Sequence, residues 1–173
     1  MKILGIVLLY NPDEKQMISN IDKYADSLIR LIVWNNTEQS NDYYKTLLKE
    51  TQYFNKLLFF GGNGNEGLSK PINLAMHMAL DEKYDCLLTM DQDSIWKNFN
   101  QYIYTIEKDI QYRNKIFVPS INDETEYDCE YVQYKNFIIN SGTMYGCNAI
   151  AEVGYMNSLF FVVKEIYIAA CTL

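Results

Sequence analysis

Two aspartates one residue apart, Asp91 and Asp93, end the apolar run Leu87-Leu88-Thr89-Met90. Side chains alternate along an extended chain, so both carboxylates project to one side while Gln92 projects away from them. Acids at the carboxyl end of a strand in an open α/β sheet face a crevice rather than the core. Two like charges this close require a cation, and Mg²⁺ or Mn²⁺ carrying the phosphates of a nucleotide would supply it. We therefore predict that Asp91 and Asp93 are metal ligands.

Two alternatives exist for this acidic segment. Asp91 or Ser94 could simply cap the next helix after a polar turn. Phosphatases of the haloacid-dehalogenase type also place a nucleophilic Asp in an Asp-x-Asp loop after an apolar strand. That loop normally opens the chain, whereas here three strand-like segments precede it.

Alternating strand and helix patterns surround the two acids. Continuous apolar runs predict buried strands, and apolar spacings of three and four predict amphipathic helices, one after each of the first four strands. Such alternation with short connections indicates a parallel sheet with right-handed crossovers. The expected strands are 3–9, 30–34, 56–60, 85–90 and 116–118, and the expected helices are 13–28, 42–50, 70–82 and 98–113. Beyond Pro119 we expect an acidic loop over 122–130, an antiparallel hairpin over 131–139 and a short helix over 149–153. Three alternatives stay open for the apolar segment 166–171: a final strand, a segment that needs a partner, or the stump of a truncated protein.

Length and composition indicate one globular domain. The chain has 173 residues, of which 49 % are hydrophobic and 21 % charged. A net charge of −7 without a Lys/Arg cluster argues against a nucleic-acid partner. The four cysteines fall in no Cys-x-x-Cys spacing, which favours reduced thiols in a cytoplasmic protein. No apolar run is long enough to cross a bilayer, so membrane association would be peripheral. The apolar C-terminal segment makes a homo-oligomer plausible.

A glycine-rich loop, 61–67, follows the third expected strand. It does not fit a nucleoside-triphosphatase phosphate loop, because Leu68 occupies the position of the required lysine. Gly62, Gly64 and Gly67 do match the spacing of a dinucleotide-binding fingerprint, and an NAD(P)-dependent oxidoreductase therefore stays an alternative. Ser69 is expected to cap the following helix, with Pro71 in its first turn. His77, the only histidine, is expected to be a packing residue.

Several motifs, in order, resemble the family 2 glycosyltransferases and most closely their rhamnosyltransferase-like branch. The resemblance covers nearly the whole chain. The matching segments are Ile6 to Pro12, Asn65-Glu66-Gly67-Leu68-Ser69 with Asn73, Leu87 to Ser94 with its Asp-Gln-Asp-Ser end, Asn140-Ser141-Gly142, Val153-Gly154-Tyr155, and Leu159-Phe160-Phe161.

This resemblance implies an α/β fold of the GT-A type: a Rossmann-like, mostly parallel sheet flanked by helices, with a small mixed acceptor-side region. Residues 1–118 would form the nucleotide-sugar-binding half of a single domain, and residues 119–173 a partial acceptor-side half. Asp93 would ligate Mg²⁺ or Mn²⁺ on the donor diphosphate, with Asp91 near the ribose or the metal. The remaining donor-site residues would be Tyr10, Asn11, Asn36, Asn65, Gly67, Ser69 and Asn73.

The resemblance also implies the reaction. A dTDP- or UDP-sugar, with rhamnose the sugar that the branch suggests, would be transferred with inversion to a saccharide or lipid-linked saccharide acceptor in bacterial polysaccharide synthesis. Two departures matter: Trp34 replaces the acid that commonly ends the second strand, and Glu165 is the one candidate base left in the acceptor-side acidic motif. Family members usually continue well beyond this motif, so a C-terminally short chain is expected. A catalytically incomplete, nucleotide-sugar-binding remnant is the corresponding alternative.

Overall fold

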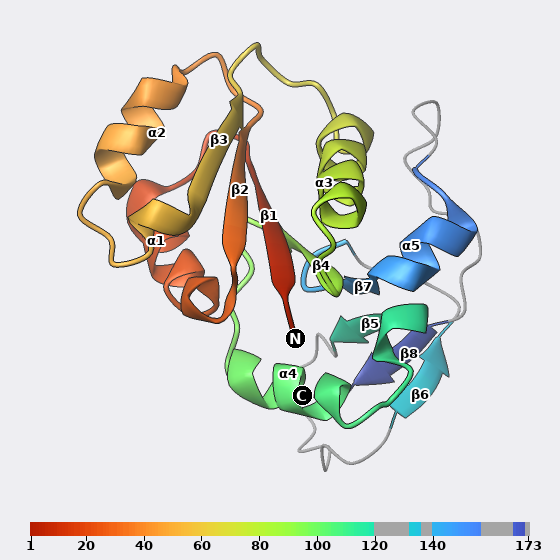
Figure 1. The fold of residues 1–173 in the computed structure, drawn as a ribbon. Coiled ribbons are helices and arrows are strands. Elements are labelled where there is room, and N and C mark those ends of the chain that lie inside the picture. The colour runs from red at the N-terminus through yellow and green to blue at the C-terminus, as the bar shows by residue number, and fades with distance from the viewer. Residues whose placement is uncertain (120–131, 136–139, 157–167, 172–173) are drawn as a thin grey trace.

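One eight-stranded sheet runs through the part of the chain that the computed structural model describes, residues 1–119, 132–135, 140–156 and 168–171 (Figure 1). The strand order is β3-β2-β1-β4-β7-β5-β8-β6. The strands are β1 (Ile3–Leu9), β2 (Arg30–Asn35), β3 (Leu57–Gly61), β4 (Cys86–Asp91), β5 (Ile116–Pro119), β6 (Val132–Lys135), β7 (Met144–Gly146) and β8 (Ile168–Cys171). The expected α/β architecture is confirmed.

The first four strands form the parallel half of the sheet. β1 pairs in parallel with both β2 and β4, and β2 pairs in parallel with β3. Every residue of β1 is buried, as expected for a continuous apolar strand covered on both faces. In the register of these pairs, Leu8 lies beside Trp34 on one side and Asp91 on the other. The carboxyl ends of β2, β1 and β4 therefore lie next to one another.

The other four strands form a mixed half of the same sheet. β7 is antiparallel to both β4 and β5, β5 is parallel to β8, and β8 is antiparallel to β6. Of the alternatives for 166–171, the structure shows the strand, since 168–171 form β8. Residues 132–135 of the expected hairpin are a strand that pairs with β8. The expected acidic loop, 122–130, lies outside the described residues.

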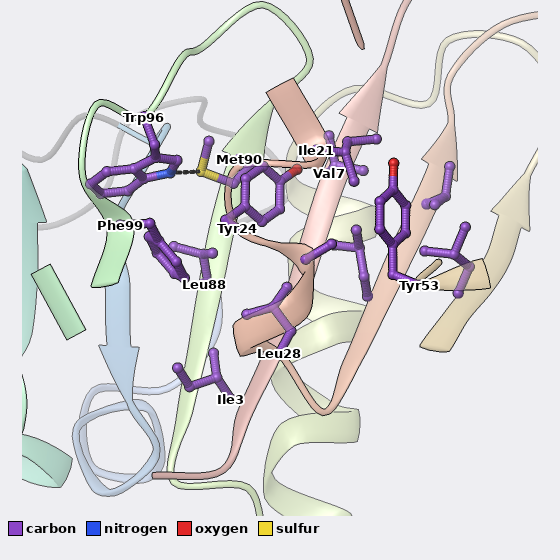
Figure 2. Packing of buried hydrophobic residues seen from close by; sticks show 14 of the residues in the cluster. Ile3, Val7, Ile21, Tyr24, Leu28, Tyr53, Leu88, Met90, Trp96 and Phe99 are labelled. Carbon is purple, nitrogen blue, oxygen red and sulfur yellow. Dashed lines mark hydrogen bonds between the residues drawn. The ribbon is translucent and has the colours of Figure 1, made fainter. Parts of the chain in front are cut away.

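Helices cover both faces of the sheet. On one face, α1 (Glu14–Ile21), α2 (Asn41–Leu48) and α4 (Phe99–Glu107) enclose the larger hydrophobic core, which includes Tyr24 and Tyr53 (Figure 2). In that core the indole Nε1 of Trp96 lies 3.1 Å from the sulfur of Met90. On the other face, α3 (Ser69–Asp81) and α5 (Cys147–Val153) pack against Leu4, Ile6 and Leu87. Among the described residues, no helix is long and apolar enough to cross a membrane.

Two helices are shorter than their apolar spacing predicted. α1 ends at Ile21, and Tyr24 packs into the core from a turn that leads to a short 3-10 helix, Ala25–Ser27. α4 ends at Glu107, and Ile110, which continues the apolar spacing of the helix expected over 98–113, is 95 % exposed. In both places the apolar spacing continues beyond the last helical residue, so spacing alone did not locate the end of the helix.

The expected cap of α3 was wrong, and the expectation that His77 is a packing residue is confirmed only in its ring contact, not in burial. Ser69 is the first residue of the helix rather than its cap, and Leu68 occupies the cap position without a side-chain hydrogen bond. His77 is exposed, and its ring stacks on Tyr155 with 3.9 Å between centroids. Pro71 lies in the first turn as expected, where its missing N–H removes no helical hydrogen bond.

Candidate nucleotide and metal site

Asp91 and Asp93 lie at the carboxyl end of β4, in the middle of the sheet. Asp91 is the last residue of the strand and is half-buried, whereas Asp93 is exposed in the following turn. Burial raises the pKa of the Asp91 carboxyl, and the negative charge of Asp93 raises it further. The neighbouring Asn140 amide acts in the opposite direction. The two carboxylates therefore repel each other at a partly desolvated position, which a cation would relieve.

The segment 140–143, which leads into β7 beside β4, supports this turn. The backbone N–H of Asp91 donates to Ser141 Oγ over 3.0 Å, and Ser141 donates to Ser94 Oγ over 2.6 Å. Both polar atoms of the Asn140 side chain are buried without a hydrogen bond of ordinary geometry. The Asn140-Ser141-Gly142 motif, which the resemblance assigned to the acceptor side, thus lies against the turn that carries the two carboxylates.

The loop after β1 carries Tyr10 and Asn11. The Tyr10 side chain is 56 % exposed, and Asn11 has a left-handed backbone conformation with φ 46°. Asn tolerates that conformation better than most residues. Gln92 links this loop to the acidic turn: it accepts from the Tyr10 N–H at 2.6 Å and donates to the Tyr10 carbonyl at 2.9 Å. Gln92 therefore ties the acidic turn to the loop after β1.

Asn36 holds the glycine-rich loop against the end of β2. Its Oδ1 accepts from the Trp34 indole at 3.1 Å and from the Glu66 N–H at 3.0 Å, while its Nδ2 donates to the Gly67 carbonyl at 2.9 Å. The side chain is only 4 % exposed. Trp34 is also buried and stacks on Phe60. The amide of Asn36 and the ring of Trp34 therefore have structural partners within the protein.

The three fingerprint glycines have the left-handed conformation that glycine favours, with φ of 90°, 87° and 75° at Gly62, Gly64 and Gly67. Their N–H groups, however, are already used. Gly62 donates to the Asn35 carbonyl, Gly64 to the Thr37 carbonyl, and Gly67 to Asn65 Oδ1. In a dinucleotide-binding fingerprint, the backbone N–H groups of the glycine loop must be free to approach a pyrophosphate. That loop also follows the first strand of the fold. Here the loop follows β3, at the edge of the sheet, so the oxidoreductase alternative is disfavoured.

The side-chain amide of Asn73 also has hydrogen-bond partners within the protein. Its Nδ2 donates to the Met156 carbonyl, and its Oδ1 accepts from the Met156 N–H, each over 2.8 Å. Ser69 is half-buried at the start of the same helix, and Asn65 is exposed except for its contact with Gly67. The candidate base Glu165 and the segment Leu159-Phe160-Phe161 lie outside the described residues.

The metal ligands that the protein offers are hard oxygen atoms, which Mg²⁺ and Mn²⁺ prefer. Asp91 and Asp93 fit such an ion, because a cation would relieve the repulsion that raises the Asp91 pKa. Nowhere in the described part of the chain do three or more His, Cys, Asp or Glu side chains cluster in a way that would hold a metal. The two aspartates therefore suit an ion that completes its coordination with ligand oxygens and water, as Mg²⁺ does with nucleotide phosphates.

No protein-family model matches the sequence, and no curated protein is significantly similar to it. Solved structures do match. Residues 1–349 of Staphylococcus aureus TarS align with 100 % of this chain and 58 % of their own length, at 15 % identity and a TM-score of 0.62. Their complex with UDP gives 14 % identity, 61 % of its length and a TM-score of 0.63. The Pyrobaculum calidifontis mannosyltransferase PcManGT, in complex with GDP-Man and Mn²⁺, aligns with 99 % of this chain at 12 % identity and a TM-score of 0.68.

The fold is of the GT-A type. The chain spans 56–61 % of the length of these three solved chains. In this fold, the turn after β4 and the loop after β1 lie together at the carboxyl ends of adjacent strands, where open α/β sheets bind their ligands.

Proposed function

We propose that this chain binds a nucleotide-sugar donor with a divalent metal ion and transfers the sugar to an acceptor hydroxyl. The observation that carries the proposal is the pair Asp91 and Asp93 at the carboxyl end of β4 in a GT-A fold, with the Asp91 pKa raised by burial and by Asp93. The solved neighbours, whose complexes contain UDP or GDP-Man with Mn²⁺, support this chemistry.

Each residue has a defined part in the proposed reaction. Asp93 and Asp91 would hold the ion, and the exposed Tyr10 ring with Asn11 would lie beside the nucleotide base. When bound, Mg²⁺ or Mn²⁺ neutralises the charge that develops on the leaving nucleoside diphosphate. Glu165 takes the proton from the acceptor hydroxyl. Direct displacement with one base, and without a covalent nucleophile, gives inversion at the anomeric carbon.

The structure supports a different role for three residues that the resemblance placed at the donor. The amides of Asn36 and Asn73 each donate to and accept from groups of the protein, and Asn65 accepts from the Gly67 N–H. We assign these three to holding the loops around the donor, together with Gly67, whose N–H and carbonyl pair with Asn65 and Asn36. Ser69 stays a proposed donor contact. The division into a donor half, 1–118, and an acceptor half, 119–173, belongs to the same proposal.

The finer features of the proposal come from the resemblance. They are a rhamnosyl donor linked to dTDP or UDP, a saccharide or lipid-linked saccharide acceptor, a cytoplasmic location at the inner face of the membrane, and self-association. Sugar choice depends on hydrogen bonds to individual hydroxyl groups, so a panel of donors distinguishes among these possibilities.

Calorimetric titration with UDP, dTDP and GDP, each with and without Mn²⁺, tests the proposal. We expect one nucleotide to bind at least about 10-fold more tightly with Mn²⁺, and Asp93→Asn to remove that gain. Asp81→Asn, a matched change at an exposed aspartate at the end of α3, should leave it intact. Absence of metal-dependent binding, or metal-free binding of NADH, would contradict the proposal. Metal-dependent binding without transfer or donor hydrolysis would instead identify the donor-binding remnant.

A further inference from the structure

The side chain of Gln92 acts as a substitute for a backbone peptide between two loops. Its amide accepts from the N–H and donates to the carbonyl of the same residue, Tyr10, at 2.6 and 2.9 Å. β1 and β4 pair through Leu8 and Asp91. Gln92 therefore adds a further pair of hydrogen bonds between the segments that follow β1 and β4.

Gln92 is itself fixed from a third element. The amide of Asn20, on α1 and 4 % exposed, donates to the Gln92 carbonyl over 2.9 Å. The backbone of Gln92 is thus tied to α1 while its side chain is tied to the loop after β1. A residue anchored at both ends loses little further freedom when a ligand binds, and such preorganisation favours binding.

We propose that Gln92 is a positioning residue that sets the separation between the nucleotide-base site at Tyr10 and the carboxylates of Asp91 and Asp93. This inference rests on the proposed function. Gln92 lies between the two aspartates in sequence and bonds to Tyr10, so a shift of one loop is transmitted to the other. A nucleoside diphosphate that contacts Tyr10 with its base and the metal with its phosphates requires both sites at one fixed distance.

A residue with only a structural role would affect stability alone. Loss of the Tyr10 contacts would then lower the melting temperature but leave the folded protein with the same gain in nucleotide affinity from Mn²⁺. A positioning role instead makes that gain fall while each separate site remains. Binding of Mn²⁺ alone reports on Asp91 and Asp93, and binding of the nucleoside alone reports on Tyr10.

The test uses the full chain with Mn²⁺, a nucleoside diphosphate and the matching nucleoside as probes. The pair is UDP with uridine, unless the wild type prefers GDP with guanosine or dTDP with thymidine. Gln92→Glu keeps the length of the side chain but turns a carboxylate oxygen toward the Tyr10 carbonyl. Gln92→Ala removes both contacts. Gln16→Glu and Gln16→Ala, at an exposed position on α1, are the matched controls.

We expect the Mn²⁺-dependent gain in diphosphate affinity, at least about 10-fold in the wild type, to fall by about 10-fold in both Gln92 variants, an effect within the range that a small misplacement produces. Binding of nucleoside alone should change less than about 3-fold in both variants, and binding of Mn²⁺ alone should change less than about 3-fold in Gln92→Ala, whereas the added carboxylate of Gln92→Glu should not weaken it. The Gln16 variants should match the wild type. Hydrogen exchange should show faster exchange of the Tyr10 amide in the Gln92 variants.

Two results would overturn the inference and are distinguishable. If the wild type shows no metal-dependent nucleotide binding, the proposed function fails, and this inference falls with it. If the wild type binds but a folded Gln92→Glu or Gln92→Ala variant keeps the full Mn²⁺-dependent gain, only the positioning role fails. Should Gln92→Ala not fold, Gln92→Glu alone decides the question.

Discussion

The side chain of Asn73 pairs with both backbone polar groups of Met156, at 2.8 Å in each direction. Asn73 lies on α3, directly after the glycine-rich loop, and Met156 follows α5 in the second half of the chain. The amide that the resemblance assigned to the nucleotide thus joins the two halves of the protein.

Asn73→Ala should therefore lower the stability of the fold. It leaves the Met156 N–H and carbonyl without their partners, and we expect a loss of about 1–3 kcal/mol in the free energy of unfolding, measured by urea denaturation. Asn55→Ala, at an exposed asparagine in the turn before β3, is the control and should cost less than about 0.5 kcal/mol. Equal losses in the two variants would show that the Asn73 contacts contribute nothing specific.

Asp91→Asn should stabilise the metal-free protein at neutral pH while removing metal-dependent binding. Because the folded-state pKa of Asp91 lies above the ordinary value of 3.8, the folded chain holds this proton more tightly than the unfolded chain does. The contribution of Asp91 to stability is therefore favourable at low pH. It is lost as the pH rises from 3.8 through the raised pKa.

Urea denaturation at pH 4 and pH 7 measures this effect. The stabilisation by Asp91→Asn should be small at pH 4 and larger at pH 7, up to about 1 kcal/mol, the size found for partly solvated charge pairs. A gain that is the same at both pH values would point to a change in packing rather than in charge. Adding Mn²⁺ with the bound nucleotide should raise the melting temperature of the wild type and not that of the variant.

Gly142 should tolerate substitution less well than Gly64, although both have a left-handed backbone, with φ of 79° and 87°. A Cβ at Gly142 would lie 2.6 Å from Pro119 Cγ, whereas a Cβ at Gly64 meets nothing within 4 Å. Gly64→Ala measures the conformational strain alone, expected at about 1 kcal/mol. Gly142→Ala should cost at least about 1 kcal/mol more because of overpacking, measured by urea denaturation. A similar cost at both positions would show that the Pro119 ring moves aside.

Cys86 and Cys147 should be inert toward thiol reagents in the native protein. Both are buried and free, and burial raises the pKa of Cys147 to about 11 and that of Cys86 further above its usual range. The reactive thiolate is therefore scarce at pH 8. In a Cys129→Ser, Cys171→Ser background, both thiols should react with Ellman's reagent only as fast as the protein opens, and rapidly in urea. Fast reaction under native conditions would contradict the burial of these two side chains.

The parallel half of the fold could be predicted closely, because its strands are continuous apolar runs with polar breaks. β1 matches the predicted range, and β4 is displaced by one residue at each end. The end of α1 could not be predicted, since Tyr24 keeps the helical spacing while packing from a turn. β6 and β8 pair over a long sequence separation, which no local pattern specifies.

The sequence indicated the two aspartates of the candidate site, but it gave little indication of the roles of the asparagine and glutamine side chains around them. The spacing of Asp91 and Asp93 after an apolar run indicated chemistry because carboxylates there require a partner. An asparagine or glutamine gives no such signal, since a backbone peptide satisfies it as well as a ligand does. Asn20 was missed for a related reason: its one visible sign is a polar side chain three residues after Met17, on the buried face of α1.

The position of β7 has a consequence for the order in which the molecule folds. β7 lies between β4 and β5 and pairs with both, yet it follows β5 by some twenty-five residues along the chain. During synthesis, β1 to β4 can assemble through local crossovers, but β4 keeps an unpaired edge, exposed to pairing with other chains, until residues 144–146 emerge. The pairing of β7 with β4 and the hydrogen bond from the Asp91 N–H to Ser141 both wait for the segment 141–146 to be synthesised. The sheet and its acidic turn therefore reach their final structure together.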